Sequence, residues 1–301
     1  MEKNIMRKPP ITFENRMDII KKSFITIAIV MSINFTASSV TFAQESKGYA
    51  PVNGLKLYYE VYGTAGVPLV LIHGGGSTIE SSFGNILPLL VKHSKVIALE
   101  LQAHGRTSDR DGALSFQQDA DDVVGLLQYL KIDKADFFGF SNGGNTAMQV
   151  AIRHPEIVDK LIIASSFYKR EGMVPGFFEG LEKASLDDMP APLKTAYWKV
   201  APDKDHLQVM FSKDRDRMVQ FKDWSDEDIR SIKASTLLIF GDHDVVTPEH
   251  ALEMFHILPH AKLMILPGTH GSYLGEVCTV DKTSKMTEMT SQMIEEFLRS
   301  N

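Results

Sequence analysis

One serine in this 301-residue sequence lies in a pattern that would make it a nucleophile. Ser141 is the centre of Gly139-Phe140-Ser141-Asn142-Gly143, with an apolar run from Ala135 to Phe140 before it and helically spaced apolar residues from Asn145 to Ile152 after it. This pattern predicts a buried strand, a sharp turn and a helix. The turn holds the hydroxyl beyond the strand, beside the positive end of the helix dipole. Glycines two residues before and after the serine let the flanking backbones pass closely, as a nucleophile elbow requires.

A serine hydroxyl is a weak nucleophile near neutral pH, so it needs an imidazole base, and the base needs an orienting carboxylate. Two strand ends downstream of Ser141 offer such groups. The run Thr236 to Phe240 leads into Gly241-Asp242-His243-Asp244, and the run Lys262 to Leu266 leads into Pro267-Gly268-Thr269-His270. Both lie where the carboxyl ends of parallel strands gather, which is where open α/β sheets place their sites.

The composition excludes several classes of function. Hydrophobic residues make up 44% of the chain and charged residues 23%, as in an ordinary globular protein. The net charge is -6 and there is no basic stripe, so we expect no nucleic-acid partner. Because Cys278 is the only cysteine, an internal disulfide and a multi-thiolate metal site are excluded. The cluster Asp242-His243-Asp244 has no second motif with metal-ligand spacing, and Gly74-Gly75-Gly76 is no dinucleotide fingerprint, so we expect neither a metal nor a cofactor.

The first 43 residues have the pattern of an export signal. Lys21 and Lys22 precede an apolar core, Phe24 to Ile33, and the small residues Thr41 and Ala43 suit a cleavage site. The core is too short, and its continuation too polar, for a membrane span. We expect a signal peptide cleaved near Ala43 and a periplasmic or secreted protein; the alternative is an uncleaved anchor, the one case in which this protein would have a membrane partner.

The rest of the chain alternates predicted strands with predicted helices. Alternating runs at 49–52 and 55–62 flank Asn53-Gly54, which predicts a hairpin with a type I′ turn. Further strands are predicted at 68–72, 95–101, 135–140, 160–164, 236–240 and 262–266, and helices at 116–130, 145–152, 248–258 and 285–298. Asp119, Asp121 and Asp122 lie near the start of the first of these helices, where carboxylates complement the helix dipole. Such alternation implies a mostly parallel sheet with right-handed crossovers.

Residues 167 to 232 interrupt this alternation. Glycines, prolines and charges are dense there, the apolar periodicity is patchy and no strand-like run occurs, so we predict a helical insertion rather than an autonomous domain. The predicted organisation is a signal at 1–43, a core in two parts at 44–166 and 233–301, and this insertion between them. Most of its aromatic and methionine side chains should pack onto the core, and a minority should line a pocket.

Four motifs in this order and spacing resemble those of the α/β-hydrolase fold superfamily, and the resemblance covers nearly all of the chain after the predicted signal. They are Leu71-Ile72-His73-Gly74-Gly75-Gly76, Gly139-Phe140-Ser141-Asn142-Gly143-Gly144, Gly241-Asp242-His243-Asp244 with Pro248, and Pro267-Gly268-Thr269-His270. The chain is most similar to single-domain, lid-bearing bacterial hydrolases, a group with esterases, lactonases and carbon–carbon bond hydrolases. The resemblance implies a mostly parallel, eight-stranded α/β sheet with helices on both faces and a helical cap.

The resemblance also implies roles for single residues. Ser141 would be the nucleophile, Asp244 the acid and His270 the base, and the backbone N–H groups of Asn142 and Gly75 would form the oxyanion hole. The motif glycines are Gly74, Gly139 and Gly143. Asp242 is a second candidate for the acid, which we interpret as a turn-capping carboxylate. We interpret His73 as a structural imidazole that shapes the oxyanion loop and His104 as a loop brace, and we expect His243 to be exposed.

These assignments predict a serine hydrolase that cleaves a small carboxylic ester, thioester or lactone through an acyl-enzyme on Ser141. Alternatives are a carbon–carbon bond hydrolase or perhydrolase with the same triad, or a non-catalytic ligand receptor. A serine at the elbow argues against a dehalogenase or epoxide hydrolase, whose relatives place an aspartate there. The partner is a small acyl substrate, and monomer and homodimer both remain open. A long polar loop, Gly271 to Ser284, is a candidate border of the pocket.

Overall fold

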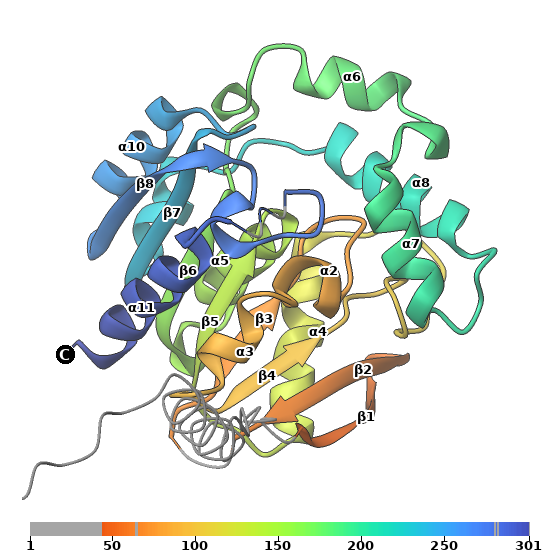
Figure 1. The fold of residues 1–301 in the computed structure, drawn as a ribbon, viewed down its shortest axis with the longest axis horizontal. Helices are drawn as coiled ribbons and strands as arrows, with labels where there is room; N and C mark the ends of the chain where they lie inside the picture. The colour runs from red at the N-terminus through yellow and green to blue at the C-terminus, as the bar shows by residue number, and fades with distance from the viewer. Residues whose placement is uncertain (1–43, 64–65, 280, 282, 301) are drawn as a thin grey trace, which may run out of the picture. The chain divides into compact units, whose positions relative to one another are not determined.

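The fold is known from a computed structural model that describes residues 44–63, 66–279, 281 and 283–300. Its eight strands form one sheet in the order β1-β2-β4-β3-β5-β6-β7-β8 (Figure 1). The strands are β1 (Gln44–Val52), β2 (Leu55–Tyr62), β3 (Leu69–Ile72), β4 (Val96–Leu99), β5 (Ala135–Phe140), β6 (Val158–Ala164), β7 (Ser235–His243) and β8 (Ala261–Thr269). From β4 to β8 all neighbours are parallel, whereas β2 is antiparallel to both of its neighbours. The prediction of a mostly parallel, eight-stranded sheet is confirmed.

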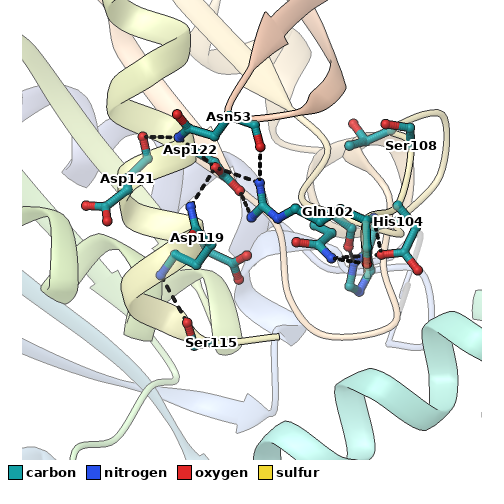
Figure 2. Close-up of polar contacts among 12 residues, drawn as sticks. Asn53, Gln102, His104, Ser108, Ser115, Asp119, Asp121 and Asp122 are labelled. Atoms are coloured by element: carbon teal, nitrogen blue, oxygen red, sulfur yellow. Dashed lines mark hydrogen bonds and ion pairs between the residues drawn. The ribbon is translucent and has the colours of Figure 1, made fainter. Parts of the chain in front are cut away.

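The predicted hairpin is also present. Asn53 and Gly54 have φ angles of 45° and 84°, the two positive values that a type I′ turn needs. The Asn53 side chain donates to the Asp122 carboxylate at 2.9 Å (Figure 2), and Arg110 pairs with the same carboxylate. The hairpin is therefore tied to the helix that carries Asp122.

Helices cover both faces of the sheet. Strand residues such as Val70 and Phe137 belong to one apolar cluster, which contains side chains of α4 (Phe116–Tyr129), α5 (Asn142–Arg153) and α10 (Pro248–Ile257). Their neighbours Leu69 and Phe138 belong to a second cluster, with side chains of α2 (Ile79–Phe83), α3 (Leu87–Leu90) and α11 (Met286–Arg299). Because successive strand residues point to opposite faces, β3, β4 and β5 are buried along their whole length, as their continuous apolar runs predict.

The helix boundaries need two corrections. The helix α5 begins at Asn142 rather than Asn145, because the turn at Ser141 leads directly into its first turn. The short helices α2 and α3 escaped prediction, since four or five residues are too few to show a helical period. The other predicted helices are present within two residues of their expected bounds.

Of the three acidic residues near the start of α4, only one lies where it can complement the helix dipole. Ser115 caps the helix by accepting the Gln118 N–H at 3.1 Å (Figure 2), and only Asp119 lies in the first turn. Asp121 pairs with Arg153, and Asp122 is bound as described above. For Asp121 and Asp122 the explanation by the helix dipole is therefore wrong; their role is in ion pairs with neighbouring elements.

Between β6 and β7 the chain forms four α-helices and no strand, as predicted for the insertion. These helices, which we call the cap, are α6 (Phe177–Lys183), α7 (Ala191–Val200), α8 (Leu207–Val219) and α9 (Asp226–Ser231). In Figure 1, α6, α7 and α8 are grouped beyond one end of the sheet. None of the helices in the described residues is long and apolar enough to cross a membrane. The predicted signal, or anchor, at residues 1–43 lies outside the described residues.

Candidate active site

The turn between β5 and α5 holds Ser141 in a strained backbone conformation. Ser141 has φ 54° and ψ -123°, which is rare for a residue with a side chain. Its flanking glycines are required by close packing: a Cβ at Gly139 would lie 2.1 Å from the Gly143 carbonyl oxygen, and one at Gly143 would lie 2.1 Å from the Ile72 carbonyl oxygen. The serine is thereby presented at the start of α5, as the pentapeptide predicts.

A hydrogen-bonded relay runs from Ser141 through His270 to Asp244. The Ser141 Oγ lies 3.1 Å from the His270 Nε2, and the His270 Nδ1 lies 2.7 Å from the Asp244 Oδ1. These residues come from three strand ends, those of β5, β7 and β8, and 129 residues separate the serine from the histidine. An acceptor at Nδ1 sets the tautomer, so that Nε2 can accept the serine proton.

The buried Asp244 carboxylate is held on several sides. Its Oδ1 also accepts the Val245 N–H at 2.7 Å, and its Oδ2 accepts the Gly241 N–H at 3.2 Å and the Ser165 hydroxyl. Burial acts to raise the pKa of Asp244, but the hydrogen bond and charge of His270 together with these donors lower it below its ordinary value. Asp244 therefore stays ionised and fixed in place beside the imidazole.

The second candidate acid, Asp242, takes no part in this relay. Its Oδ1 accepts the Gly268 N–H at 2.8 Å and lies 2.8 Å from the His243 Nδ1. The first of these bonds joins the ends of the neighbouring strands β7 and β8 rather than capping a turn, so the turn-capping role that we expected is wrong. The side chain of His243 is exposed, as expected.

The loop after β3 is shaped by His73. The Nε2 of His73 accepts the Leu101 N–H at 3.0 Å, so its Nδ1 carries the proton and donates to the Gly74 carbonyl at 2.7 Å. Burial lowers the pKa of His73 to about 3, which keeps the ring neutral. The Gly74 carbonyl and the Gly75 N–H belong to one peptide group, so His73 orients that N–H. This matches the structural role that we predicted for the imidazole.

Two backbone N–H donors beside Ser141 are free to bind a ligand. In the described part of the chain, neither the Gly75 N–H nor the Asn142 N–H has a hydrogen-bond partner, and both residues border the same pocket as Ser141 and His270. The Asn142 N–H is unused because it opens α5, where the first N–H groups have no intrahelical acceptor. They are the two donors that we expected to form an oxyanion hole.

A buried charged cluster beside this loop was missed by sequence reasoning. Asp214 of α8 accepts the Gly76 N–H at 2.6 Å and pairs with His104 at 3.2 Å and with Arg217. Arg217 in turn pairs with Asp119 of α4 at 2.6 Å. Only an i, i+3 spacing of Asp214 and Arg217 hints at this pairing in the sequence, and solvent-exposed helices show the same spacing.

His104 braces its loop, as predicted. Its Nδ1 lies 2.8 Å from the Gln102 carbonyl oxygen (Figure 2), and its Nε2 faces Asp214. Burial acts to lower the pKa of His104, but the Asp214 carboxylate outweighs it and raises the pKa above its ordinary value. Both ring nitrogens are thus engaged, and neither faces the pocket.

The pocket in front of Ser141 has a volume of about 310 Å³ and is mainly apolar. Its charged lining residues are Asp188, Asp214, Arg215 and His270. The apolar ones are Phe167, Met173, Phe177, Leu181, Ala184, Met189, Pro190, Leu193, Met210, Phe211, Met218 and Val245. Almost all of them come from the segment between β6 and β7. None of the described residues in the polar loop from Gly271 to Ser284 lines this pocket, so for these residues the expected place at its border is wrong.

Among the described residues, no three His, Cys, Asp or Glu side chains are placed to hold a metal ion. The groups that the described residues bring together at the site are a hydroxyl, an imidazole, a carboxylate and two backbone donors.

Known proteins resemble this chain in both sequence and fold. A family model described as "alpha/beta hydrolase fold" matches residues 67–197. The 2-hydroxymuconate semialdehyde hydrolase of Pseudomonas sp. (strain CF600) is 31% identical over 206 residues, 61% of this chain and 72% of that protein. The serine hydrolase BPHL of Homo sapiens is 28% identical over 238 residues, 74% of this chain and 79% of that protein.

Among solved structures, the enol-lactonase from Burkholderia xenovorans LB400 has the same fold. Its TM-score is 0.65 at 22% sequence identity, over 84% of this chain and all of that chain (100%). The family-model match and the 31% identical relative show that the chain is a hydrolase that belongs to the α/β-hydrolase fold family.

Proposed function

We propose that this protein is a serine hydrolase that cleaves small carboxylic esters, thioesters or lactones through an acyl-enzyme on Ser141. One observation carries the proposal: the Ser141 Oγ, the His270 imidazole and the Asp244 carboxylate are joined by hydrogen bonds of 3.1 and 2.7 Å at the wall of an apolar pocket. This is the arrangement that activates a hydroxyl for acyl transfer.

Acylation follows from this relay. The His270 Nε2 takes the hydroxyl proton as the Ser141 Oγ bonds to the carbonyl carbon, and the carbonyl electron pair moves onto oxygen. The Gly75 and Asn142 N–H groups donate to that oxyanion, and loss of one such donor typically slows a reaction by ~10²–10³. Collapse of the tetrahedral intermediate breaks the bond to the leaving group, which takes the proton from His270. Asp244 stabilises the imidazolium throughout.

Deacylation repeats these steps with water. His270 removes a proton from water as the water oxygen attacks the acyl carbon, and then returns the proton to the Ser141 Oγ as the acid departs. The same two N–H groups serve the second tetrahedral intermediate.

The pocket lining supports a substrate with an apolar acyl or alcohol part. Phenylalanine, methionine and leucine side chains surround the serine, and the Arg215 guanidinium is bound to Asp216 at 2.7 Å and to the Ala184 carbonyl at 3.1 Å. An apolar group would therefore be held by burial rather than by ion pairing.

Labelling with a fluorophosphonate followed by peptide mapping tests the proposal. We expect modification of Ser141 and hydrolysis of short p-nitrophenyl esters, with both lost in Ser141→Ala. A Ser141→Ala protein as active as the wild type would overturn the proposal. A matched control is Ser166→Ala, because the Ser166 hydroxyl is close to the site but bonds to Asn145 instead of His270.

A second candidate, hydrolysis of a carbon–carbon bond with the same triad, is favoured by the named substrate of the Pseudomonas relative. A panel of esters, lactones and hydroxymuconate-type semialdehydes separates the two. Turnover of the semialdehydes at a kcat/KM above that of every ester and lactone would select the second candidate.

A further inference from the structure

Asp214 reaches from the cap to the loop that carries a proposed oxyanion donor. Its Oδ2 accepts the Gly76 N–H at 2.6 Å, and its Oδ1 lies 3.5 Å from the Asn142 side-chain amide nitrogen. Gly76 directly follows Gly75, and Asn142 directly follows Ser141. One carboxylate of α8 therefore binds the backbone beside one proposed donor, Gly75, and lies next to the side chain of the residue that supplies the other, Asn142.

The fit around Gly75 is close. A Cβ at this residue would lie 2.5 Å from the Asn142 amide nitrogen and 2.7 Å from the Asp214 Oδ2. These two side chains occupy the space that any larger residue would need. The loop is therefore packed against Asp214 as well as hydrogen-bonded to it.

Asp214 is itself anchored to the core. It is buried, it pairs with Arg217 on its own helix, and Arg217 is held by the buried Asp119 of α4. His104, from the loop after β4, meets the same Oδ2 at 3.2 Å. The Arg217 guanidinium beside it offsets its charge, so that the carboxylate can lie near a developing oxyanion.

The two peptide groups around Gly75 are thus held from two directions. His73, at the end of β3, binds the Gly74 carbonyl and orients the peptide that contains the Gly75 N–H. Asp214, from the cap, binds the N–H of the next peptide. An N–H donor is effective only if it is already aimed at the oxyanion before the reaction starts.

We propose that Asp214 is a positioning residue for the oxyanion hole: through it the cap helix α8 holds the Gly75–Gly76 peptide, and thereby keeps the adjoining peptide that carries the Gly75 N–H in its reactive orientation. This inference rests on the proposed function. It makes the seating of α8 on the core a condition for full activity, and not only for enclosing the substrate.

The test is Asp214→Ala, read by ester hydrolysis and by two inhibitors. We expect kcat to fall by about 10- to 100-fold, with KM changed by less than about threefold, since the donor acts on the transition state. His104 Nε2, at 3.3 Å from the Gly76 nitrogen, is a poorer substitute acceptor. Asp214→Asn, whose amide oxygen can still accept the Gly76 N–H, should recover part of the rate.

The inhibitor comparison separates positioning from a general loss of structure. With a trifluoromethyl ketone, the Ser141 Oγ bonds to the carbonyl carbon, the hydroxyl proton passes to His270, and the carbonyl electron pair moves onto oxygen to give an oxyanion. The matching methyl ketone binds largely without addition. Asp214→Ala should lower the affinity for the trifluoromethyl ketone by the same factor as kcat and leave the affinity for the methyl ketone unchanged. An equal loss of affinity for both ketones would overturn the inference.

Gln208→Ala is the matched control, since Gln208 lies on the same helix, is exposed and bonds to Ser212 outside the pocket lining. If Asp214→Ala does not fold, Asp214→Leu with Arg217→Met and Asp119→Asn removes all three charges of the buried cluster while filling the space, and the same inhibitor ratio applies. If the wild type is active and the Asp214 variants have an unchanged kcat, this inference is overturned and the proposed function stands. A wild type that neither labels nor hydrolyses esters would overturn the proposed function, and this inference with it.

Discussion

Two aspartate–histidine pairs near the elbow have the same chemical groups and different surroundings. His270 meets Asp244 at 2.7 Å, and its other nitrogen faces the Ser141 hydroxyl. His104 meets Asp214 at 3.2 Å, and its other nitrogen is bound to a backbone carbonyl. The side chain of His270 is 29% exposed, whereas that of His104 is 0% exposed.

The difference lies in what the second nitrogen can do. The Nε2 of His270 opens onto the pocket, so it can exchange a proton with a hydroxyl and with water. His104 has no such partner, and Asp214 is held by Arg217, whose charge is permanent. One pair is arranged to move protons, and the other is arranged to hold two parts of the chain together.

Removing His270 should have the largest effect. His270→Ala takes away the base that accepts the serine proton, and we expect kcat for p-nitrophenyl esters to fall by about 10⁴-fold or more. Fluorophosphonate labelling of Ser141 should disappear as well. A fall of less than tenfold in a folded variant would contradict the distinction between the two pairs.

Asp244→Asn should have the next largest effect. The amide can no longer accept the proton of the His270 Nδ1, which favours the wrong tautomer, so we expect kcat to fall by about 10³–10⁴. Steady-state kinetics measure the loss, and circular dichroism checks the fold. Asp242→Asn serves as the control; we expect it to stay within about threefold of the wild type because Asp242 joins the ends of β7 and β8 and takes no part in the relay.

His104→Gln should affect stability more than rate. Glutamine can still donate to Asp214, but the exchange disturbs a fully buried hydrogen-bonded group, so we expect about 1–3 kcal/mol lower free energy of unfolding. The kcat should fall by less than about tenfold. Urea unfolding and ester kinetics on the same sample measure both quantities, and a loss of kcat as large as that of His270→Ala would make His104 a proton carrier.

Substitution of the buried Asp136 should have the smallest effect. The Oδ1 of Asp136 on β5 has no hydrogen-bond partner among the described residues. Burial, with the nearby Asp159, raises the pKa of Asp136 from 3.8 to about 7. Between these values the folded protein holds a proton that the unfolded chain releases, so stability should fall as the pH rises through this window.

Asp136→Asn should remove this dependence. We expect the free energy of unfolding to rise by about 1 kcal/mol at pH 8 and to be unchanged at pH 4, with kcat unaltered. Urea unfolding at the two pH values provides the measurement, with the exposed Asp133→Asn as the control. An equal change at both pH values would mean that ionisation of Asp136 is not the cause.

Much of the core could be predicted from local patterns. The apolar runs of β3 and β5 predict strands buried on both faces, and Asn53-Gly54 predicts the hairpin, because backbone preferences and burial act within a few residues. The glycines around Ser141 predict a tight turn for the same reason. The positions of Ser141, Asp244 and His270 follow from such turns at the ends of neighbouring strands.

What the sequence could not reveal depends on side chains that meet across the fold. Asp214 belongs to a helix whose charges look like those of a solvated surface, and only the packing of α8 against α4 buries its partner Arg217. The lining of the pocket by the cap, and the absence from it of the described part of the loop after His270, are decided in the same way. The sequence alone determined which backbone turns present the reactive groups, because those turns are local. The tertiary structure decided which charges are buried and what they hold, because burial and pairing arise only when distant segments pack together.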